Sequence, residues 1–328
     1  MGDKDPLIKV VNLKKWFPVR KGIKFLGKRE YVKAVDGVTF HINEGEVFGL
    51  AGESGCGKTT TGRTVLRLVE PTAGEVFFDG QNIFKIEEEE LRKLRKKMQI
   101  IFQDPYESLS PRMTIFDIIS EPIRVHKLVQ SYEEQVELVS KTLERVELVP
   151  PEEFLHRYPH ELSGGQRQRV AIARALVLNP KFIVADEPVS MLDVSIRAGI
   201  LKLMLGLRDE MGISYLFITH DLATARHVCD RLAIMYLGKI VEMGDVEDLV
   251  REPIHPYTEA LLAAVPVPDP TAERIKVIIS GEVPSSINPP PGCRFHPRCP
   301  YAKEICRKKE PELVNVEVGR QVACHLRI

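Results

Sequence analysis

The chain has 328 residues, with 46 basic and 46 acidic side chains and therefore a formal net charge of zero. This length can bury a large core, and the balanced charge argues against nucleic-acid binding. No apolar run approaches the roughly 20 residues of a membrane-spanning helix, and the first residues lack the apolar stretch of a signal peptide. We expect a soluble, cytosolic protein with one large domain and an appendage, so that any work inside a membrane falls to a partner.

The N-terminal part alternates between predicted strands and helices. Residues 8–13 and 35–42 alternate apolar and polar side chains, which predicts strands. Residues 47–51 form a compact apolar run typical of a buried parallel strand, and residues 60–68 predict a helix. A glycine-rich segment separates this strand from this helix, which is the order found in phosphate-binding loops.

The glycine-rich segment, residues 52–59, fits the phosphate-loop pattern G-x-x-x-x-G-K-[ST]. Lys58 supplies a positive charge for the β- and γ-phosphates, and Thr59 supplies a hydroxyl for Mg²⁺. Three glycines let backbone N–H groups converge on the phosphates: Gly52, Gly55 and Gly57. Together these residues predict a nucleotide site.

The middle of the chain is predicted to be helical and is followed by two buried strands. Residues 87–97 carry acids first and bases last, as a solvated helix does. Residues 105–162 are mostly helical by pattern with no strand signal, and they read as an insertion between two halves of a parallel sheet. Residues 182–185 and 214–219 are buried-strand runs. This alternation predicts an α/β fold with helices on both faces of a sheet.

Two carboxylates, Asp186 and Glu187, follow the strand at residues 182–185. A parallel strand delivers such side chains to the carboxyl edge of its sheet, where a nucleotide binds. Asp186 suits Mg²⁺, held through a water molecule, and Glu187 suits the orientation or deprotonation of an attacking water.

The five residues 162–166, LSGGQ, lie downstream of the phosphate loop. Ser163, Gly164 and Gly165 open a predicted helix, whose exposed N–H groups form an anion site. The phosphate loop followed by LSGGQ resembles the ATP-binding cassette (ABC) ATPases. The resemblance implies a P-loop cassette with a RecA-like parallel sheet core, an antiparallel β part and an inserted helical subdomain.

The resemblance also implies roles for single residues. Gln103 matches the glutamine that contacts Mg²⁺ and relays contacts to the membrane partner. His220 matches the switch histidine at the γ-phosphate, and Asp193 matches the loop that crosses the dimer interface. An aromatic side chain usually stacks on adenine; Phe17 is the best positional match, with Trp16 and Tyr31 as rivals. The implied nucleotide contacts further include Ser54, Thr60, Ser163, Gly165 and Gln166, and the implied Mg²⁺ contacts are Thr59, Gln103 and Asp186.

One chain carries two phosphate-binding devices, and one ATP can use both only if they face each other. In ABC proteins the LSGGQ segment completes the site of the opposite subunit, so two cassettes enclose two ATP molecules head to tail. The resemblance therefore implies a second cassette as partner, with ATP binding closing the dimer and hydrolysis releasing it.

The residues after about 252 are rich in proline and hold a set of four cysteines, Cys293, Cys299, Cys306 and Cys324. Four thiolates suit either tetrahedral Zn²⁺ or a [4Fe–4S] cluster. Residues 255–258 and 291–300 resemble the C-terminal extension of oligopeptide/dipeptide ABC importers, some of which carry an iron–sulfur cluster on these cysteines. The resemblance implies a [4Fe–4S] cluster, with zinc as the alternative.

Residues 34–38, 108–112 and 179–190 look like the F-type of the two ATPase subunits of these importers, although Met191 stands where alanine is usual.

The implied domains are a cassette at residues 1–252, with its helical subdomain at about 105–165, and an extension at 253–328. The implied function is ATP hydrolysis that energises import of peptides, or alternatively of nickel or oligosaccharides; a non-transport ABC protein is the remaining alternative. The implied partners at the cytoplasmic face of the membrane are a D-type cassette, two transmembrane permease subunits and, indirectly, an extracytoplasmic solute-binding protein, with no nucleic acid.

Overall fold

Two compact units make up the chain. The computed structural model describes residues 5–19, 30–264 and 281–327. The first unit comprises Met1–Asn43, Val47–Phe84 and Ile218–Ile328, and the second comprises Glu44–Glu46 and Lys85–Phe217. Within the described ranges, no helix has both the length and the apolar character needed to cross a bilayer.

The first unit contains two groups of paired strands. One is an antiparallel sheet with the order β2-β1-β4-β5, in which Ile8 pairs with Ile42 on one side and Phe78 on the other. The other has the order β11-β12-β10-β9-β3, antiparallel except for the parallel pair β3 and β9. The strands are β1 (Ile8–Pro18), β2 (Tyr31–Ile42), β3 (Val47–Ala51), β4 (Ala73–Phe78), β5 (Gln81–Asn82), β9 (Arg231–Tyr236), β10 (Lys239–Asp245), β11 (Val314–Glu317) and β12 (Arg320–Val322).

The helix after the phosphate loop begins earlier than the sequence predicts. All five residues of β3 are buried, as expected, but the helix covers Lys58–Val65 rather than residues 60–68. Gly57, at φ 110°, turns the chain so that Lys58 is already helical, and Arg67, at φ 49°, cannot continue the helix. The helices of this unit are α1 (Lys58–Val65), α9 (Leu222–Val228), α10 (Val246–Arg251), α11 (Pro256–Ala263) and α12 (Glu304–Lys308).

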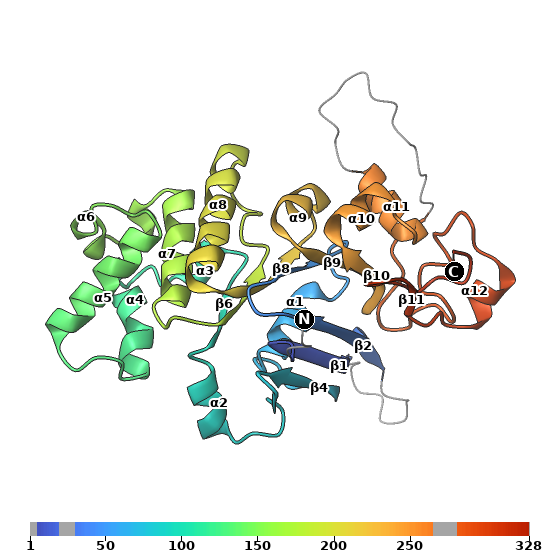
Figure 1. The fold of residues 1–328 in the computed structure, drawn as a ribbon, viewed down its shortest axis with the longest axis horizontal. Helices are drawn as coiled ribbons and strands as arrows, with labels where there is room; N and C mark the ends of the chain where they lie inside the picture. The colour runs from blue at the N-terminus through green and yellow to red at the C-terminus, as the bar shows by residue number, and fades with distance from the viewer. Residues whose placement is uncertain (1–4, 20–29, 265–280, 328) are drawn as a thin grey trace. The chain divides into compact units, whose positions relative to one another are not determined.

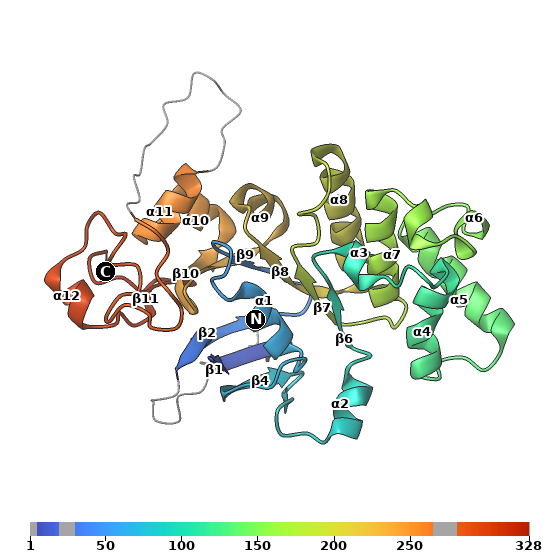
Figure 2. The same cartoon turned by 180° about the vertical axis from the view of Figure 1, so that it is seen from behind.

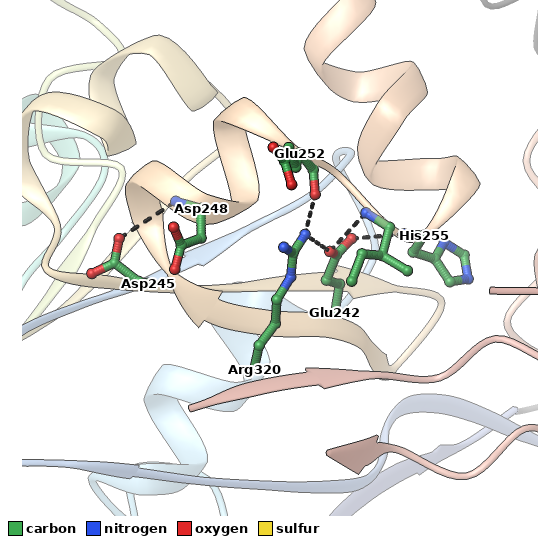
Figure 3. A network of polar contacts seen from close by, with 7 residues as sticks. Glu242, Asp245, Asp248, Glu252, His255 and Arg320 are labelled. Atoms are coloured by element: carbon green, nitrogen blue, oxygen red, sulfur yellow. Dashed lines mark hydrogen bonds and ion pairs between the residues drawn. The ribbon is translucent and has the colours of Figure 1, made fainter. Parts of the chain in front are cut away.

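The C-terminal residues extend a sheet of the first unit, because β12 pairs with β10 through Glu242 and Val322. A buried network reinforces this edge (Figure 3). The Glu242 carboxylate, fully buried, accepts the N–H groups of Ile254 and His255 at 2.9 Å each. It also pairs at 3.0 Å with Arg320, which donates in addition to the carbonyl oxygen of Glu252. The sequence predicted only irregular segments here, so these short strands are an addition.

The second unit is largely helical, and residues 105–162 contain no strand, as predicted. Its strands β6 (Met98–Ile101) and β7 (Phe182–Asp186) pair in parallel. In Figures 1 and 2 the helices α4, α5 and α6 gather beside α7. The helices are α2 (Glu88–Leu94), α3 (Pro105–Ser108), α4 (Ile115–Val125), α5 (Tyr132–Arg145), α6 (Glu152–Leu155), a 3₁₀ turn (Pro159–Glu161), α7 (Gly164–Leu176) and α8 (Val194–Met211).

The strand β8 (Ser214–Thr219) covers the predicted residues and is buried throughout. Its first four residues belong to the second unit and its last two to the first. The sequence also predicts a basic insertion at residues 20–30, read as a solvated hairpin, and apart from Glu30 it lies outside the described residues.

Candidate functional site

The phosphate loop of the first unit requires glycine at two positions. Gly52 has φ 154°, and a Cβ there would lie 2.2 Å from the carbonyl oxygen of Met235. Gly57 has φ 110°, and a Cβ there would lie 2.0 Å from the carbonyl oxygen of Ala34. Any side chain at either position would therefore collide with backbone. The loop follows β3 and leads into α1, as the sequence predicts.

Lys58 lies buried inside this loop. Its Nζ donates to the carbonyl oxygens of Gly52 at 2.8 Å and Glu53 at 3.1 Å. The first turn of α1 carries no acidic residue, so its N–H groups and helix dipole favour an anion. Among the other predicted loop residues, Ser54 and Gly55 are exposed, whereas Thr59 and Thr60 are half-buried.

Cys56 occupies a free position of the loop pattern and is buried. Burial raises the pKa of its thiol more strongly than the Lys58 charge lowers it. The thiol is therefore protonated and unreactive near neutral pH, which agrees with a purely structural position.

His220 stands at the end of β8 with its side chain exposed. The backbone around it is fixed, because the N–H of Asp221 donates to Thr219 Oγ1 at 3.0 Å. Asp221 then caps α9 by accepting the N–H of Ala223 at 2.9 Å. This turn presents the imidazole at the carboxyl end of the strand, where a switch histidine is expected.

The three aromatic candidates for adenine stacking differ in their contacts. Trp16 Nε1 donates to Asp36 Oδ1 at 3.0 Å, and the Trp16 ring lies 6.3 Å from that of Tyr31. Phe17 is 38% exposed, with Lys15 Nζ 4.8 Å from its ring centre. Phe17 therefore offers the most accessible ring face of the three.

In the second unit, Gln103 and Glu187 meet. Gln103 Nε2 donates to Glu187 Oε2 at 3.1 Å. Asp186, the last residue of β7, is only 1% exposed, and Glu187 follows it at φ 48°. The Glu187 carbonyl oxygen accepts bonds from the N–H and hydroxyl of Ser190 at 3.1 and 3.0 Å. The turn after β7 thus holds the backbone of Glu187, while Gln103 holds its carboxylate.

The LSGGQ segment starts α7 with a capping box. Ser163 Oγ accepts the N–H of Gln166 at 3.3 Å, and Gln166 Oε1 accepts the N–H of Ser163 at 2.9 Å. Gly165 is buried against Ile196 of α8. Asp193 precedes α8 and is exposed, and so is Met191, which is 60% exposed.

The predicted nucleotide residues are thus divided between the two units. The first unit holds the phosphate loop, His220 and Phe17, and the second holds the pair formed by Gln103 and Glu187 together with Asp186 and the LSGGQ segment. Their action on a common nucleotide stays a prediction.

The four C-terminal cysteines line one small pocket, together with His255 and His296. Burial raises the pKa of Cys293 to about 11 and also raises the pKa values of Cys299 and Cys324. The described residues contain no group of three or more His, Cys, Asp or Glu side chains placed to hold a metal ion.

Comparison with known proteins agrees with these features. A family model described as "ABC transporter" matches residues 35–190, and one described as "Oligopeptide/dipeptide transporter, C-terminal region" matches residues 241–306. The chain is 51% identical to the putative oligopeptide transport ATP-binding protein YkfD of Bacillus subtilis, over 98% of this chain and 95% of that one. The chain belongs to the ABC transporter family of ATPases.

Other relatives extend the likeness of this ABC ATPase. It is 50% identical to the oligopeptide transport ATP-binding protein AppF of Bacillus subtilis, covering 99% of this chain and 98% of AppF. It is 47% identical to the dipeptide transport ATP-binding protein DppF of Haemophilus influenzae, covering 97% and 96% of the two chains.

Solved structures confirm the predicted fold. A dimeric post-hydrolysis state of the ATP-binding cassette MJ0796 with ADP and phosphate has a TM-score of 0.63 and 32% identity, covering 73% of this chain and 98% of that one. The cbiO1 cassette of Clostridium perfringens, also at a TM-score of 0.63, is 28% identical and covers 76% and 92% of the two chains. The ABC ATPase is an α/β P-loop protein with a mixed sheet and an antiparallel part, as the sequence predicts.

Proposed function

We propose that this protein is the ATP-hydrolysing subunit that energises import of oligopeptides or dipeptides. The main support is the likeness to named oligopeptide and dipeptide transport ATP-binding proteins over nearly the whole chain, including the C-terminal region. Nickel or oligosaccharide uptake would use the same ATPase chemistry and is the alternative. A non-transport role is disfavoured by the full-length match to transport proteins.

In the proposed site, the phosphate loop binds the nucleotide. Lys58 neutralises charge on the β- and γ-phosphates, while backbone N–H groups hold the phosphate oxygens. Phe17 stacks on adenine. The loop contacts are those of Gly52, Ser54, Gly55, Gly57, Thr59 and Thr60.

Thr59, Gln103 and Asp186 carry oxygen donors, which suit Mg²⁺. Bound there, Mg²⁺ would neutralise charge on the phosphates during transfer to water. Glu187 is the proposed base for the attacking water, and its hydrogen bond with Gln103 orients the carboxylate. His220 contacts the γ-phosphate.

The LSGGQ segment acts on the nucleotide of a second cassette. Ser163, Gly165 and Gln166 open α7, whose first turn has no acidic residue, so an anion is favoured at this end. Asp193 lies at the start of α8, and Ile196 of the same helix lies against Gly165. The proposed assembly pairs this chain head to tail with a D-type cassette at the cytoplasmic face of the membrane. Both cassettes contact two permease subunits, to which an extracytoplasmic solute-binding protein delivers the solute.

The cysteine-lined pocket is the proposed site of a [4Fe–4S] cluster. The support is the chemistry of the donors, because four thiols line one pocket and thiolates are the ligands of such clusters, although the side chains as they stand are not gathered around a metal position. Zinc remains the alternative, and the cluster would supply structural cross-links within the extension.

Peptide uptake tests the proposed function directly. The wild-type chain should restore uptake of a labelled tripeptide to cells that lack their F-type subunit, and Lys58→Ala should not. Restored uptake of nickel or an oligosaccharide without peptide would overturn the substrate and leave the ATPase role.

Anaerobic purification with iron, sulfide and zinc analysis tests the cluster. About four irons per chain are expected, with loss of iron in Cys306→Ser. A colourless protein that contains zinc, or no metal, would contradict it.

A further inference from the structure

Glu53 lies in the phosphate loop, and two residues from the C-terminal part of the chain hold it. Arg298 binds both of its carboxylate oxygens, through Nη1 at 2.8 Å and Nη2 at 3.1 Å. The Tyr257 hydroxyl oxygen accepts the backbone N–H of Glu53 at 2.9 Å. One loop residue is therefore fixed at its side chain and at its backbone by the same distant segment.

These contacts are largely shielded from solvent. The Arg298 side chain is 9% exposed, and Tyr257 is fully buried. The Tyr257 ring packs against Tyr236 and Phe295, with centroids 4.7 and 5.4 Å apart. A two-pronged Arg–carboxylate pair is among the strongest polar contacts, and this one raises the pKa of Arg298, chiefly through its hydrogen bonds with Glu53.

The contacts bear on nucleotide binding through Lys58. The Glu53 carbonyl oxygen accepts Lys58 Nζ, so a shift of Glu53 moves the residue that meets the phosphates. The Glu53 carboxylate would also repel phosphate oxygens from within the loop, and Arg298 neutralises it. Arg298 therefore sets both the shape and the charge of the loop.

A second tether from the same segment reaches the neighbouring turn. Arg294 donates to the carbonyl oxygen of Leu237 and pairs with Asp36. Gly238, next to Leu237, donates its N–H to the carbonyl oxygen of Cys56 at 2.8 Å. The two arginines adjoin Cys293 and Cys299, so the segment that lines the cysteine pocket also supports the phosphate loop.

We propose that Arg298 and Tyr257 are positioning residues that hold the phosphate loop in its nucleotide-binding shape. The C-terminal extension then contributes to ATP affinity in addition to its own folding. This inference rests on the proposed function, since it takes the loop to be the ATP site. Linkage is reciprocal, so nucleotide must in turn stabilise the segment that carries Arg298.

Titration of the full-length chain with a fluorescent ATP analogue and Mg²⁺ tests the inference. Arg298→Ala should raise the Kd by about five- to twentyfold, within the usual range of coupling between sites. Arg307→Ala is the matched control, because Arg307 also adjoins a cysteine but is exposed, and it should bind as wild type does. Adding Glu53→Gln to Arg298→Ala should recover part of the affinity, because the unpaired carboxylate is then gone.

Two further measurements separate positioning from general stability. Nucleotide should slow amide hydrogen exchange at residues 293–299 in wild type and lose that effect in Arg298→Ala, which a merely structural role would not produce. If Arg298→Ala fails to fold, Tyr257→Phe keeps the ring and removes only the hydroxyl, and its Kd should still rise. If the wild-type chain binds nucleotide and the Kd of Arg298→Ala or Tyr257→Phe equals that of Arg307→Ala, the inference is wrong and the proposed function stands. If the wild-type chain binds no nucleotide, the proposed function is wrong.

Discussion

Gln103 Nε2 donates a hydrogen bond to Glu187 Oε2 at 3.1 Å, across 84 positions of sequence. The parallel pairing of β6 with β7 accounts for this meeting, because Gln103 follows one strand and Glu187 the other. The Gln103 amide therefore holds one oxygen of the Glu187 carboxylate in place. A proposed base is thus oriented by a residue that also suits Mg²⁺.

Glu187→Gln should bind ATP with an affinity within a fewfold of wild type but hydrolyse it about 10²- to 10⁴-fold more slowly, the usual contribution of a general base. Its dimer with the sister cassette should stay closed. Phosphate release and gel filtration with ATP measure the two effects. Glu133→Gln, an exposed change on α5, is the control. Turnover of Glu187→Gln at the wild-type rate would refute the role.

Asp36 predicts a pH dependence of stability. Burial alone would raise the pKa of its carboxyl, but the charge and hydrogen bond of Arg294, with help from Lys239 and Trp16, hold the pKa below its usual value. The folded state therefore binds fewer protons than the unfolded state as pH falls toward about 3.9 and below. The stabilisation is complete above that value and is lost as pH drops through the lower, folded-state pKa.

Asp36→Asn should accordingly lower the free energy of unfolding by about 1–3 kcal/mol near pH 7, since it removes a hydrogen-bonded charge pair. The gap to wild type should narrow below about pH 4, where the wild-type carboxyl also becomes neutral. Urea titrations at several pH values measure this gap. Trp16, the only tryptophan, donates to Asp36, so its fluorescence reports the local change. A gap that widens in acid would contradict the assignment.

The buried pair of Glu242 and Arg320 makes a separate prediction (Figure 3). Arg320→Ala leaves a fully buried carboxylate without its cation, which should cost about 3–5 kcal/mol in urea unfolding. Arg226→Ala removes a two-pronged contact with Glu247, but this pair is on the surface, so a far smaller loss is expected. Equal losses in the two variants would show that the buried network adds nothing.

The sequence reveals those site residues that belong to a local pattern. The phosphate loop between β3 and α1, and the carboxylates after β7, follow directly from an apolar run joined to a short motif. The sequence places the start of α1 too late, because the left-handed turn at Gly57 cannot be predicted from residue type alone. Local pattern and backbone geometry therefore agree on where the loop and the carboxylates lie in the fold and differ on helix boundaries.

Residues whose partners are distant carry no such pattern. Tyr257 and Arg298 reach Glu53 across 204 and 245 positions, and Arg294 reaches Asp36 across 258. Their sequence context resembles an importer extension but names no partner for them, because the sheet that brings β10 and β12 together is set by tertiary packing. The support of the phosphate loop by the extension could be found only in three dimensions.

Gly165 tests the second role of the chain, toward the nucleotide of a partner cassette. A Cβ at Gly165 would lie 2.7 Å from Ile196 Cγ2, so Gly165→Ala must displace the Ile196 side chain or the helix α8 that carries it, at the start of which Asp193 lies. We expect a stability loss of about 1–3 kcal/mol from overpacking. Nucleotide affinity of the isolated chain should stay within twofold of wild type, because the phosphate loop lies elsewhere in the sequence, whereas hydrolysis by the assembled dimer should fall at least about tenfold.

Gly206→Ala, the same change on α8 with nothing within 4 Å of the new Cβ, is the matched control for Gly165→Ala. It should leave hydrolysis intact and slightly strengthen the helix. Ile196→Ala added to Gly165→Ala removes the colliding Cγ2 and should recover part of the hydrolysis. If the isolated Gly165→Ala chain instead lost nucleotide affinity, the LSGGQ segment would serve the chain's own nucleotide, and the head-to-tail arrangement would be wrong.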